Sequence, residues 1–478
     1  MNNQRLELVA DFYEYTMSNG YLNKKMENQI AYFDVFFRKV PDEGGYAIIA
    51  GLEQIINYIK NLSFDEEDIN YLRKQNKFSE EFLNYLENFR FTGDVWAIPE
   101  GTVVFPNEPL ITVRAPIIQA QLLETMLLLT TNHQSLIATK TSRIVKEAQG
   151  RPVMEFGARR AHGINAAEEG ARAAIIGGAI GTSCTLSAKE FNVPASGTMA
   201  HSWVQSFDSE YEAFKTYAEI YPDDCTLLID TYNTIESGLP NAIKVFNEVL
   251  KPKGYKPKAV RLDSGDLAYL SKKVRKILDE AGYTECKICA TNSLDEYLIK
   301  SLIEQDAKID SFGVGENLIT AKSEPVFGGV YKLVGIEKDT KIIPKIKVSE
   351  NVVKVTNPGF KKVYRFYDNE SQKAIADVIA LSDEIIDERE YMIFDPQNPW
   401  KKKLIKDYTI RELQEKIFEN GKLIYKSPTL EEIAKKSKKE LNSIWEEVKR
   451  IENPHKYYVD LSKKLWILKN NMLNNIYF

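Results

Sequence analysis

Residues 259–265 read Ala259-Val260-Arg261-Leu262-Asp263-Ser264-Gly265. Apart from Arg261, the first four residues are apolar, and an apolar run without regular alternation is typical of a strand buried on both faces of a sheet. Polar and small residues follow at once. Further runs of this kind occur at residues 153–157, 179–182, 193–202, 226–231, 287–292 and 309–315. Most of them lead into a helical pattern, and alternation of strands and helices predicts a parallel sheet.

The number and spacing of these runs favour a β/α barrel over a short open sheet. An open, doubly wound sheet remains the alternative, because repeats of strand and helix build both architectures. We therefore predict an α/β fold in which residues 121–345 form a β/α barrel domain, entered through a long helical stretch at 119–149.

The two flanks of this domain have different patterns. Residues 1–120 predict a separate N-terminal α+β domain, with helical spacing, a strand and short proline-punctuated β-like pieces. The helical stretches are 11–22, 47–61 and 65–91, the strand is 31–38, and the β-like pieces lie in 94–115. Residues 346–478 are lysine-rich and less regular, and we predict a C-terminal extension of unassigned function.

The composition excludes several classes of protein. A chain of 478 residues is too long for one ordinary core. A formal charge of -5, from 63 basic and 68 acidic side chains, argues against nucleic-acid binding as the main function. Four cysteines do not make a disulfide scaffold at this length. With no secretory signal and no apolar run near the ~18 residues of a membrane span, we expect a reduced, soluble, cytoplasmic protein.

Polar residues gather where the predicted strands end. In both candidate architectures ligands bind at the carboxyl ends of the strands. The residues there are Arg159, Arg160, His201, Asp230, Arg261, Asp263, Asp266, Asn292, Gly313 and Gly315. Their coincidence at one edge predicts a ligand site.

His201 is one of only four histidines, and it ends a strand-like run among residues too small to cover it. An imidazole can accept and release a proton or a phosphoryl group near neutral pH. The alternative is a core histidine bonded to a backbone carbonyl.

Three further signals point to phosphorylated or carboxylate ligands. Gly313-Val314-Gly315 after a strand lets backbone N–H groups approach a phosphate, although a tight turn has the same pattern. Residues 261–266 combine an arginine, two carboxylates and a hydroxyl, with a helix N-cap by Asp263 or Ser264 as the alternative. The pair Arg159-Arg160 suits a carboxylate or phosphate, or else a salt bridge to Glu168 or Glu169.

Several motifs together resemble the nicotinate phosphoribosyltransferase family. They occur in the family's order and span most of residues 10–335. They are Asp11-Phe12-Tyr13, Phe36-Phe37-Arg38, residues 155–160 (Glu-Phe-Gly-Ala-Arg-Arg), residues 197–202 (Gly-Thr-Met-Ala-His-Ser), residues 261–266, Phe312-Gly313-Val314-Gly315 and residues 329–333.

The resemblance implies a fold and a reaction. The fold would be a β/α barrel like that of the type II phosphoribosyltransferases. The enzyme would join nicotinate to the ribose of 5-phosphoribosyl-1-pyrophosphate, giving nicotinate mononucleotide and pyrophosphate for NAD synthesis. ATP hydrolysis would be coupled through a phosphohistidine at His201, and Mg²⁺ would neutralise the phosphates. The resemblance implies candidates for the metal ligands but leaves the full ligand set unknown.

The resemblance also implies roles for single residues, with His201 and Asp263 as the catalytic pair. Tyr13 would stack on the pyridine ring, reaching into the neighbouring subunit of a homodimer with shared active sites. Arg159 would pair with the nicotinate carboxylate, with Thr198 close by and Arg160 as the weaker candidate. Arg261 would bind the donor phosphates, and Asp263 and Asp266 would hold ribose and metal. Gly313 and Gly315 would bind the 5′-phosphate. Asp230 would contact ribose or Mg²⁺.

One residue departs from the family pattern. Glu316 stands where many members carry a threonine, and it would repel a phosphate unless it points away. Thr320 could bind the phosphate instead if a helix begins here.

Three alternatives to the nicotinate enzyme remain. They are a related nicotinamide or quinolinate phosphoribosyltransferase, a non-catalytic nucleotide sensor on the same fold, and an unrelated barrel lyase, which would need a Schiff-base lysine at a strand end.

Overall fold

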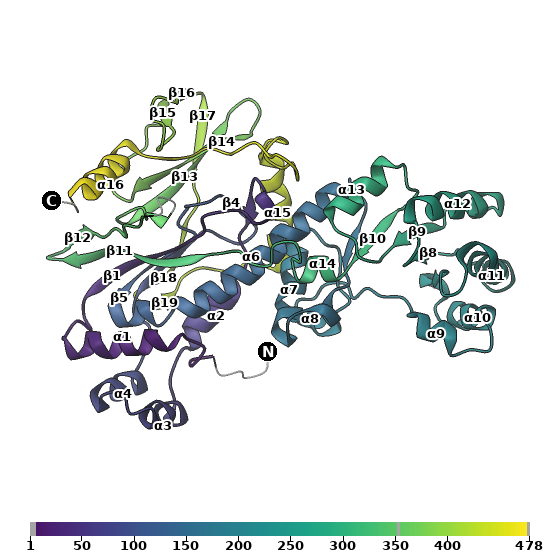
Figure 1. Ribbon diagram of the computed structural model, residues 1–478, viewed down its shortest axis with the longest axis horizontal. Helices are drawn as coiled ribbons and strands as arrows, with labels where there is room; N and C mark the ends of the chain where they lie inside the picture. The colour runs from purple at the N-terminus through teal and green to yellow at the C-terminus, as the bar shows by residue number, and fades with distance from the viewer. Residues whose placement is uncertain (1–5, 351–353, 476–478) are drawn as a thin grey trace. The chain divides into compact units, whose positions relative to one another are not determined.

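The computed structural model describes residues 6–350 and 354–475. The chain divides into two compact units. The first, here called the barrel unit, is Ile137–Pro325. The second, here called the flanking unit, combines Met1–Leu136 with Val326–Phe478. Each unit is described by itself (Figure 1).

The barrel unit is built on a parallel sheet in the order β6-β10-β9-β8-β7. Its strands are β6 (Val153–Glu155), β7 (Thr226–Leu228), β8 (Ala259–Leu262), β9 (Lys287–Ala290) and β10 (Ser311–Val314). Single bridges from Glu155 to Thr182 and from Thr182 to Ala195 extend the ladder beyond β6. The first strand pairs with the last, and from Ala195 through β6 to β7 the ladder passes through all the predicted runs in cyclic chain order. This arrangement confirms the predicted β/α barrel over an open sheet.

Helices separate the strands of the barrel unit. Figure 1 shows α10 and α11 side by side. The helices are α7 (Ile164–Ile176), α8 (Thr185–Glu190), α9 (His201–Gln205), α10 (Glu210–Ile220), α11 (Leu239–Val245), α12 (Leu267–Glu280), α13 (Glu296–Glu304) and α14 (Glu316–Ile319). Shorter turns of helix are η2 (Ala158–Arg160), η3 (Pro222–Asp224), η4 (Thr234–Gly238), η5 (Phe246–Leu250) and η6 (Lys251–Lys253).

Two predicted strands are reduced to single bridge residues. The run 179–182 contributes only the bridge at Thr182. The run 193–202 contributes only the bridge at Ala195, and His201 is the first residue of α9 instead of the end of a strand. Pro194 cannot donate to a ladder, and the residues after it have little apolar surface to bury. Its carbonyl nevertheless accepts a hydrogen bond from the backbone of Thr182, which keeps this segment at the barrel edge.

The flanking unit contains a seven-stranded sheet in the order β12-β11-β1-β5-β3-β18-β19. A second sheet has the order β17-β13-β14-β20. The strands of the first sheet are β1 (Ile30–Phe36), β3 (Asp94–Ala97), β5 (Ile111–Pro116), β11 (Val330–Lys338), β12 (Lys341–Pro344), β18 (Glu415–Glu419) and β19 (Lys422–Leu423). The others are β13 (Lys361–Asp368), β14 (Ala374–Leu381), β17 (Tyr408–Glu412) and β20 (Val459–Leu461), with two small pairs, β2 (Ala47–Ile48) with β4 (Val103–Val104) and β15 (Glu390–Phe394) with β16 (Lys402–Lys406).

The predicted N-terminal helices are present with one shift. Residues 47–61 were expected to be helical throughout, but Ala47–Ile48 is a strand and the helix begins after Gly51, whose φ is 101°. The helices are α1 (Phe12–Asn23), α2 (Leu52–Asn61), α3 (Glu66–Lys74), α4 (Glu80–Glu87), α5 (Ile117–Gln121), α6 (Glu124–Glu147), α15 (Leu430–Ser443) and α16 (Lys463–Asn475), with the short turn η1 (Pro41–Glu43). Within the described ranges no helix is long and apolar enough to cross a membrane.

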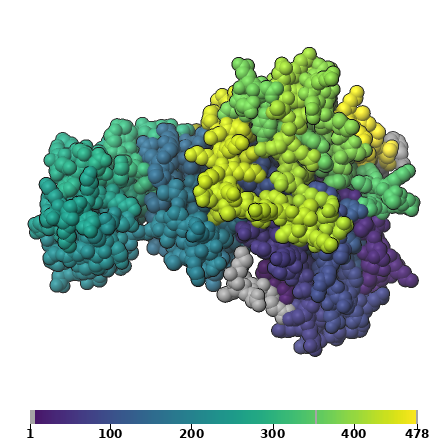
Figure 2. Space-filling model, turned by 180° about the vertical axis from the view of Figure 1, so that it is seen from behind, coloured from purple at the N-terminus to yellow at the C-terminus, as the bar shows by residue number. Residues whose placement is uncertain are grey.

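The N-terminal and C-terminal parts of the chain share the sheets of the flanking unit. β1 pairs with β11, and β3 pairs with β18. Figure 2 shows the same intermixing from behind, with yellow-green C-terminal segments directly against purple N-terminal ones. The compact units therefore meet at residues 136/137 and 325/326, whereas the domain boundaries predicted from the sequence lie at 120/121 and 345/346.

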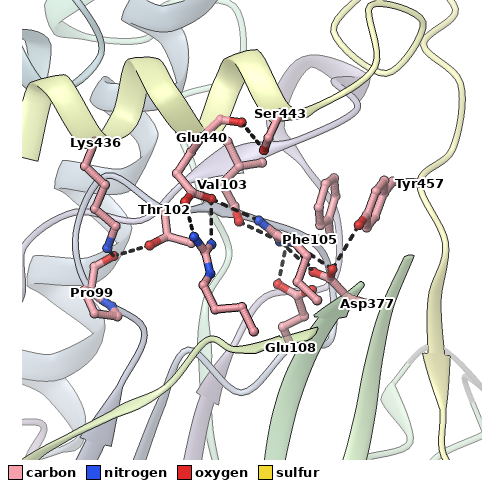
Figure 3. Close-up of polar contacts among 12 residues, drawn as sticks. Pro99, Thr102, Val103, Phe105, Glu108, Asp377, Lys436, Glu440, Ser443 and Tyr457 are labelled. Atoms are coloured by element: carbon pink, nitrogen blue, oxygen red, sulfur yellow. Dashed lines mark hydrogen bonds and ion pairs between the residues drawn. The ribbon is translucent and has the colours of Figure 1, made fainter. Parts of the chain in front are cut away.

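A buried charge cluster joins these parts of the flanking unit. Arg365 on β13 is fully buried and bonds to Asp377 on β14, with 2.6 Å between Nη2 and Oδ2. It also donates to the carbonyl of Val103, at 2.9 Å, and to Glu440 on α15, at 3.3 Å. Figure 3 shows Glu108 and Tyr457 pointing toward Asp377, and the Tyr457 hydroxyl donates to it at 2.9 Å. Because Arg365 pairs with the carboxylates of Asp377 and Glu440, pairing offsets part of the desolvation cost of these charges.

Candidate active site

Asp230 connects the ends of two neighbouring barrel strands. β7 and β8 are parallel partners, so the residues after both strands reach the same edge. One carboxylate oxygen of Asp230 accepts hydrogen bonds from the backbone N–H of Asp263, at 2.9 Å, and from the hydroxyl of Ser264, at 2.6 Å. Within the described part of the chain its other oxygen is buried and has no hydrogen-bond partner.

Asp263 and His201 meet at this edge. The Nε2 atom of His201 lies 3.5 Å from Oδ2 of Asp263, and the two side chains are 39% and 34% exposed. The other oxygen of Asp263 accepts a hydrogen bond from the hydroxyl of Thr291, which follows β9. The Nδ1 atom of His201 lies 3.1 Å from the hydroxyl of Thr231, which follows β7. The ring nitrogens of His201 contact the side chains of Thr231 and Asp263 instead of a backbone carbonyl. The structure therefore does not support the alternative of a core histidine.

Arg261 brings the segment before His201 to the same place. Its Nη1 atom donates to the hydroxyl of Thr198 at 2.5 Å. Its Nε atom is buried and has no hydrogen-bond partner among residues 6–350 and 354–475. An arginine with an unused buried donor is suited to an anionic oxygen.

Arg159 and Arg160 stand on the turn that follows β6. Glu155, fully buried at the end of β6, accepts hydrogen bonds from the backbone of Gly157 and from the hydroxyl of Thr182, the latter at 2.6 Å. Burial raises the pKa of Glu155, and the two hydrogen bonds oppose that shift. The turn is therefore anchored to two adjacent strand ends.

The two arginines of this turn have different surroundings. Arg160 lies 4.0 Å from a carboxylate oxygen of Glu316. Arg159 is exposed, and among residues 6–350 and 354–475 no ion pair involves it. The predicted alternative of a salt bridge to Glu168 or Glu169 is therefore not formed, and the guanidinium of Arg159 is available to a ligand.

Gly313 and Gly315 occupy different environments. Gly313 is buried inside β10, where a Cβ would lie 2.5 Å from the Phe156 ring. Gly315 is the residue before α14. Packing alone accounts for a glycine at 313, and the predicted phosphate contacts of both glycines stay predictions.

Glu316, the departure from the family pattern, is turned toward a lysine. Its carboxylate bonds to Lys322 at 2.6 Å, and this hydrogen bond lowers the pKa of Glu316. A helix does begin at Glu316, but the hydroxyl of Thr320 donates to the Glu316 carbonyl at 2.8 Å. Thr320 is thus already used within the helix.

Asp266 and Tyr13 each bond to other residues of their own unit. Asp266 is exposed and caps α12, accepting the N–H of Tyr269 at 3.0 Å. The N-cap expected at Asp263 or Ser264 is therefore at Asp266. Tyr13 belongs to the flanking unit, on α1, and is 42% exposed. Burial of its hydroxyl, and then the carboxylate of Glu124 bonded to it, raise the pKa of Tyr13.

The sequence patterns did not single out Thr231, Thr291 or Glu155. Each is a polar residue at the end of a predicted strand, which is the signal that identified the other site residues. The two threonines carry no charge and Glu155 reads as part of the strand, so their contacts were visible only in the structure.

The carboxylates of this edge fit Mg²⁺. The ion prefers oxygen ligands and is usually held by one or two carboxylates together with substrate phosphates. Asp230 offers an unpartnered buried oxygen, and Asp263 follows the adjacent strand. In the described part of the chain no group of three or more His, Cys, Asp or Glu side chains is placed to hold a metal by itself.

Family models cover nearly the whole chain. The nicotinate phosphoribosyltransferase N-terminal domain matches residues 8–132, the nicotinate phosphoribosyltransferase family matches 152–373, and the C-terminal domain matches 360–469. The last match assigns most of residues 346–478, which had no assigned function from the sequence, to the C-terminal domain of this family.

Whole proteins match as well. The nicotinate phosphoribosyltransferase of Bacillus subtilis (strain 168) is 45% identical over 472 residues, which is 98% of this chain and 96% of that protein. The nicotinate phosphoribosyltransferase of Caenorhabditis elegans is 34% identical over 96% of this chain and 92% of its own length.

Solved structures agree on the fold. The crystal structure of human nicotinic acid phosphoribosyltransferase superposes with a TM-score of 0.85 at 26% identity, covering 98% of this chain and 100% of that one. A nicotinate-nucleotide pyrophosphorylase from Pyrococcus furiosus shares the fold with a TM-score of 0.70 at 24% identity, over 93% and 97% of the two chains. These likenesses confirm the predicted fold class, a type II phosphoribosyltransferase-like barrel with N-terminal and C-terminal parts. The chain therefore belongs to the nicotinate phosphoribosyltransferase family and is an enzyme of that family.

Proposed function

We propose that this enzyme transfers phosphoribose from 5-phosphoribosyl-1-pyrophosphate to nicotinate, for NAD synthesis in the cytoplasm, and couples the transfer to ATP through a phosphohistidine at His201. The observation that carries the proposal is the network that joins His201, Asp263 and Asp230 at the carboxyl edge of the barrel. The 45% identity to a nicotinate phosphoribosyltransferase over nearly the full chain supports the same reaction.

In the transfer step the pyridine nitrogen forms a bond to C1 of the ribose. The bond from C1 to pyrophosphate breaks, and pyrophosphate leaves with the electron pair. The protein mainly positions the reactants and stabilises the separating charge. Arg261, with its unpartnered buried Nε, would bind the donor phosphates. Asp230, Asp263 and Asp266 would hold ribose hydroxyls, and the backbone at Gly313 and Gly315 would take the 5′-phosphate.

Nicotinate recognition would depend on its negative charge. Arg159, exposed at the end of β6, would form a charge-assisted pair with the carboxylate. Thr198, bonded to Arg261, would lie close to it. Tyr13 would stack on the pyridine ring from the neighbouring subunit of a homodimer whose active sites are shared.

ATP would act through His201. An imidazole nitrogen forms a bond to the γ-phosphorus, the bond from that phosphorus to the bridging oxygen breaks, and ADP leaves with the electron pair. Water later releases phosphate from the ring and restores the imidazole. Asp263, 3.5 Å from Nε2, would stabilise positive charge on the ring during both steps. Asp230 and Asp263, together with the phosphates, would hold Mg²⁺, which would supply charge neutralisation.

The reaction is tested by a steady-state assay with phosphoribosyl pyrophosphate, Mg²⁺ and ATP, in which nicotinate, nicotinamide and quinolinate are offered in parallel. We expect mononucleotide from nicotinate alone, with ADP formed alongside. Product from nicotinamide or quinolinate would move the chain to a sister activity. No product from any of the three would favour the sensor.

The phosphohistidine is tested by His201→Ala. This variant should lose nicotinate-dependent ATP hydrolysis and keep a slow, ATP-independent transfer. His455→Ala is the matched control, because His455 is an exposed histidine of the flanking unit, outside the network. Unchanged ATP coupling in His201→Ala would exclude the phosphohistidine.

A further inference from the structure

Thr231 contacts the proposed phosphoryl acceptor directly. Its hydroxyl lies 3.1 Å from Nδ1 of His201, within hydrogen-bond distance. The opposite ring nitrogen, Nε2, is 3.5 Å from Asp263, which is an ion-pair distance but long for a hydrogen bond. The better-formed contact of the ring is therefore the one to Thr231.

The backbone that carries Thr231 is held on both sides. Before it, the N–H of Ile229 donates to the Arg261 carbonyl at 3.2 Å, and Asp230 accepts two hydrogen bonds from residues after β8. After it, the side chain of Asn233 caps η4, accepting N–H groups at 3.1 and 2.9 Å. Gly238, at the end of η4, packs so closely that a Cβ would lie 1.8 Å from the Ile229 carbonyl oxygen. Thr231 thus stands on a fixed turn.

The segment that carries His201 has much less support of its own. α9 is only five residues long, and its N-cap, Ala200, makes no side-chain cap hydrogen bond. Most residues from 192 to 202 are exposed or half-buried. The direction of the imidazole therefore depends on what its ring nitrogens contact.

We infer that Thr231 is a positioning residue for His201, whose hydroxyl sets the rotation of the imidazole so that the ring can receive the phosphoryl group. A hydroxyl suits this task because it can donate or accept, so it keeps contact with Nδ1 in either tautomer. The carboxylate of Asp263 can only accept. The catalytic part of this inference rests on the proposed phosphohistidine. The fixing of the imidazole by the Thr231 hydroxyl does not depend on that proposal.

The test compares Thr231→Val, which keeps the shape but removes the hydroxyl, with Thr231→Ser, which keeps the hydroxyl. Phosphoenzyme formation is followed with γ-labelled ATP, and the ring nitrogens of His201 are observed by NMR in ¹⁵N-histidine-labelled enzyme, with His201→Ala identifying the signals. We expect Thr231→Val to slow phosphoenzyme formation by roughly 3- to 10-fold, the factor for one neutral hydrogen bond, and to shift the His201 signals. Thr231→Ser should restore both readouts.

Two results would overturn the inference: wild-type rates and signals in Thr231→Val, or equal losses in the valine and serine variants. Failure of the proposed function is seen separately. If His201→Ala keeps full ATP coupling, the phosphohistidine is wrong. The NMR comparison of the two Thr231 variants then still decides whether the hydroxyl holds the ring.

Discussion

Arg159 differs from its neighbour Arg160 in its partners. Arg160 faces Glu316, whereas Arg159 is exposed on a turn anchored by Glu155. We expect Arg159→Ala to raise the KM for nicotinate by roughly 10- to 100-fold, the range for loss of a hydrogen bond to a charged group. The KM for the phosphoribosyl donor should change little. Steady-state kinetics with each substrate varied in turn measures both values.

Arg160→Ala is the matched control for this prediction, since it removes the adjacent guanidinium from the same turn. We expect a small effect on both constants. An equal loss for nicotinate and donor in Arg159→Ala would instead indicate a structural role, because a uniform loss does not distinguish the two substrates.

Glu155 is a buried carboxylate with two donors to satisfy. Glutamine has a single side-chain oxygen, so Glu155→Gln places an amide N–H₂ against either Gly157 or Thr182. We expect a loss of about 1–3 kcal/mol in the free energy of unfolding, the cost of leaving a buried donor unpaired. Urea unfolding followed by circular dichroism measures it, and a wild-type midpoint would show that the pocket rearranges.

The charged residues of the site could be predicted from the sequence because they follow apolar strands. Asp230 and Asp263 were placed at one edge on that basis, and they are joined there. Their exact partners could not be predicted. Thr231 and Thr291 act through hydroxyl groups. The role of each hydroxyl depends on the direction of its side chain and on which strands are neighbours, and a local sequence pattern predicts neither of these.

Strands buried on both faces were the most predictable elements, because a short, continuous apolar run fits a doubly covered strand better than a loop or a surface helix. The run 193–202 failed because it holds Pro194 and small residues, with little apolar surface to bury. The prediction of a helix over residues 47–61 was wrong at its first end. Gly51, which has a left-handed conformation, separates a strand from the helix, and helical spacing in the sequence does not reveal this break.

The packing of η4 against β7 depends on Gly238. A Cβ at this position would lie 1.8 Å from the Ile229 carbonyl oxygen, so backbone must move. We expect Gly238→Ala to lower the free energy of unfolding by about 1–3 kcal/mol, the usual cost of overpacking. Displacement of the turn should also weaken the contact of Thr231 with His201. Calorimetry measures the first effect and the ¹⁵N signals of His201 measure the second.

Gly20 provides the opposite case. It lies within α1, and a Cβ there would meet nothing within 4 Å. Gly20→Ala should stabilise the protein by up to about 1 kcal/mol, because alanine favours helix over glycine. If Gly238→Ala and Gly20→Ala both destabilised the protein, the space around each glycine would not decide the sign of the change in the free energy of unfolding.

At the scale of the whole molecule, the sharing of sheets was not predictable. β1 and β11 pair although they are almost 300 residues apart in the sequence, and β3 pairs with β18 over a similar separation. Composition and periodicity report only on neighbours along the chain. The C-terminal region therefore read as an appended extension, whereas its strands complete the sheet begun by the N-terminal residues.

The same joining of distant segments favours the protonated form of Glu108. Burial, and then the neighbouring Asp377, raise the pKa of Glu108 well above its usual range. One of its oxygens accepts the N–H of Phe105 at 2.9 Å, and the other has no hydrogen-bond partner among the residues that the structure describes. A proton on that second oxygen would bond to Asp377, which also binds Arg365 and Tyr457.

The sign of the pH effect follows from the raised pKa. The folded state favours the protonated form, so the stabilisation is complete below the unfolded pKa of about 4.3 and is lost as pH rises toward the folded value. Glu108→Gln keeps an acceptor for Phe105 and a donor for Asp377 but cannot ionise. Relative to the wild type, we expect this variant to gain stability between pH 5 and 8, by at most about 1.4 kcal/mol per pH unit.

Tryptophan fluorescence in urea measures this difference, because Trp96, Trp400, Trp445 and Trp466 all belong to the flanking unit. Glu81→Gln on α4 is the control, since Glu81 is exposed and the same change there should give a pH-independent offset. A parallel offset for Glu108→Gln would mean that Glu108 is ionised in the folded protein across this range. The cluster would then carry an unbalanced buried charge, and Glu108→Gln should stabilise the flanking unit equally at every pH.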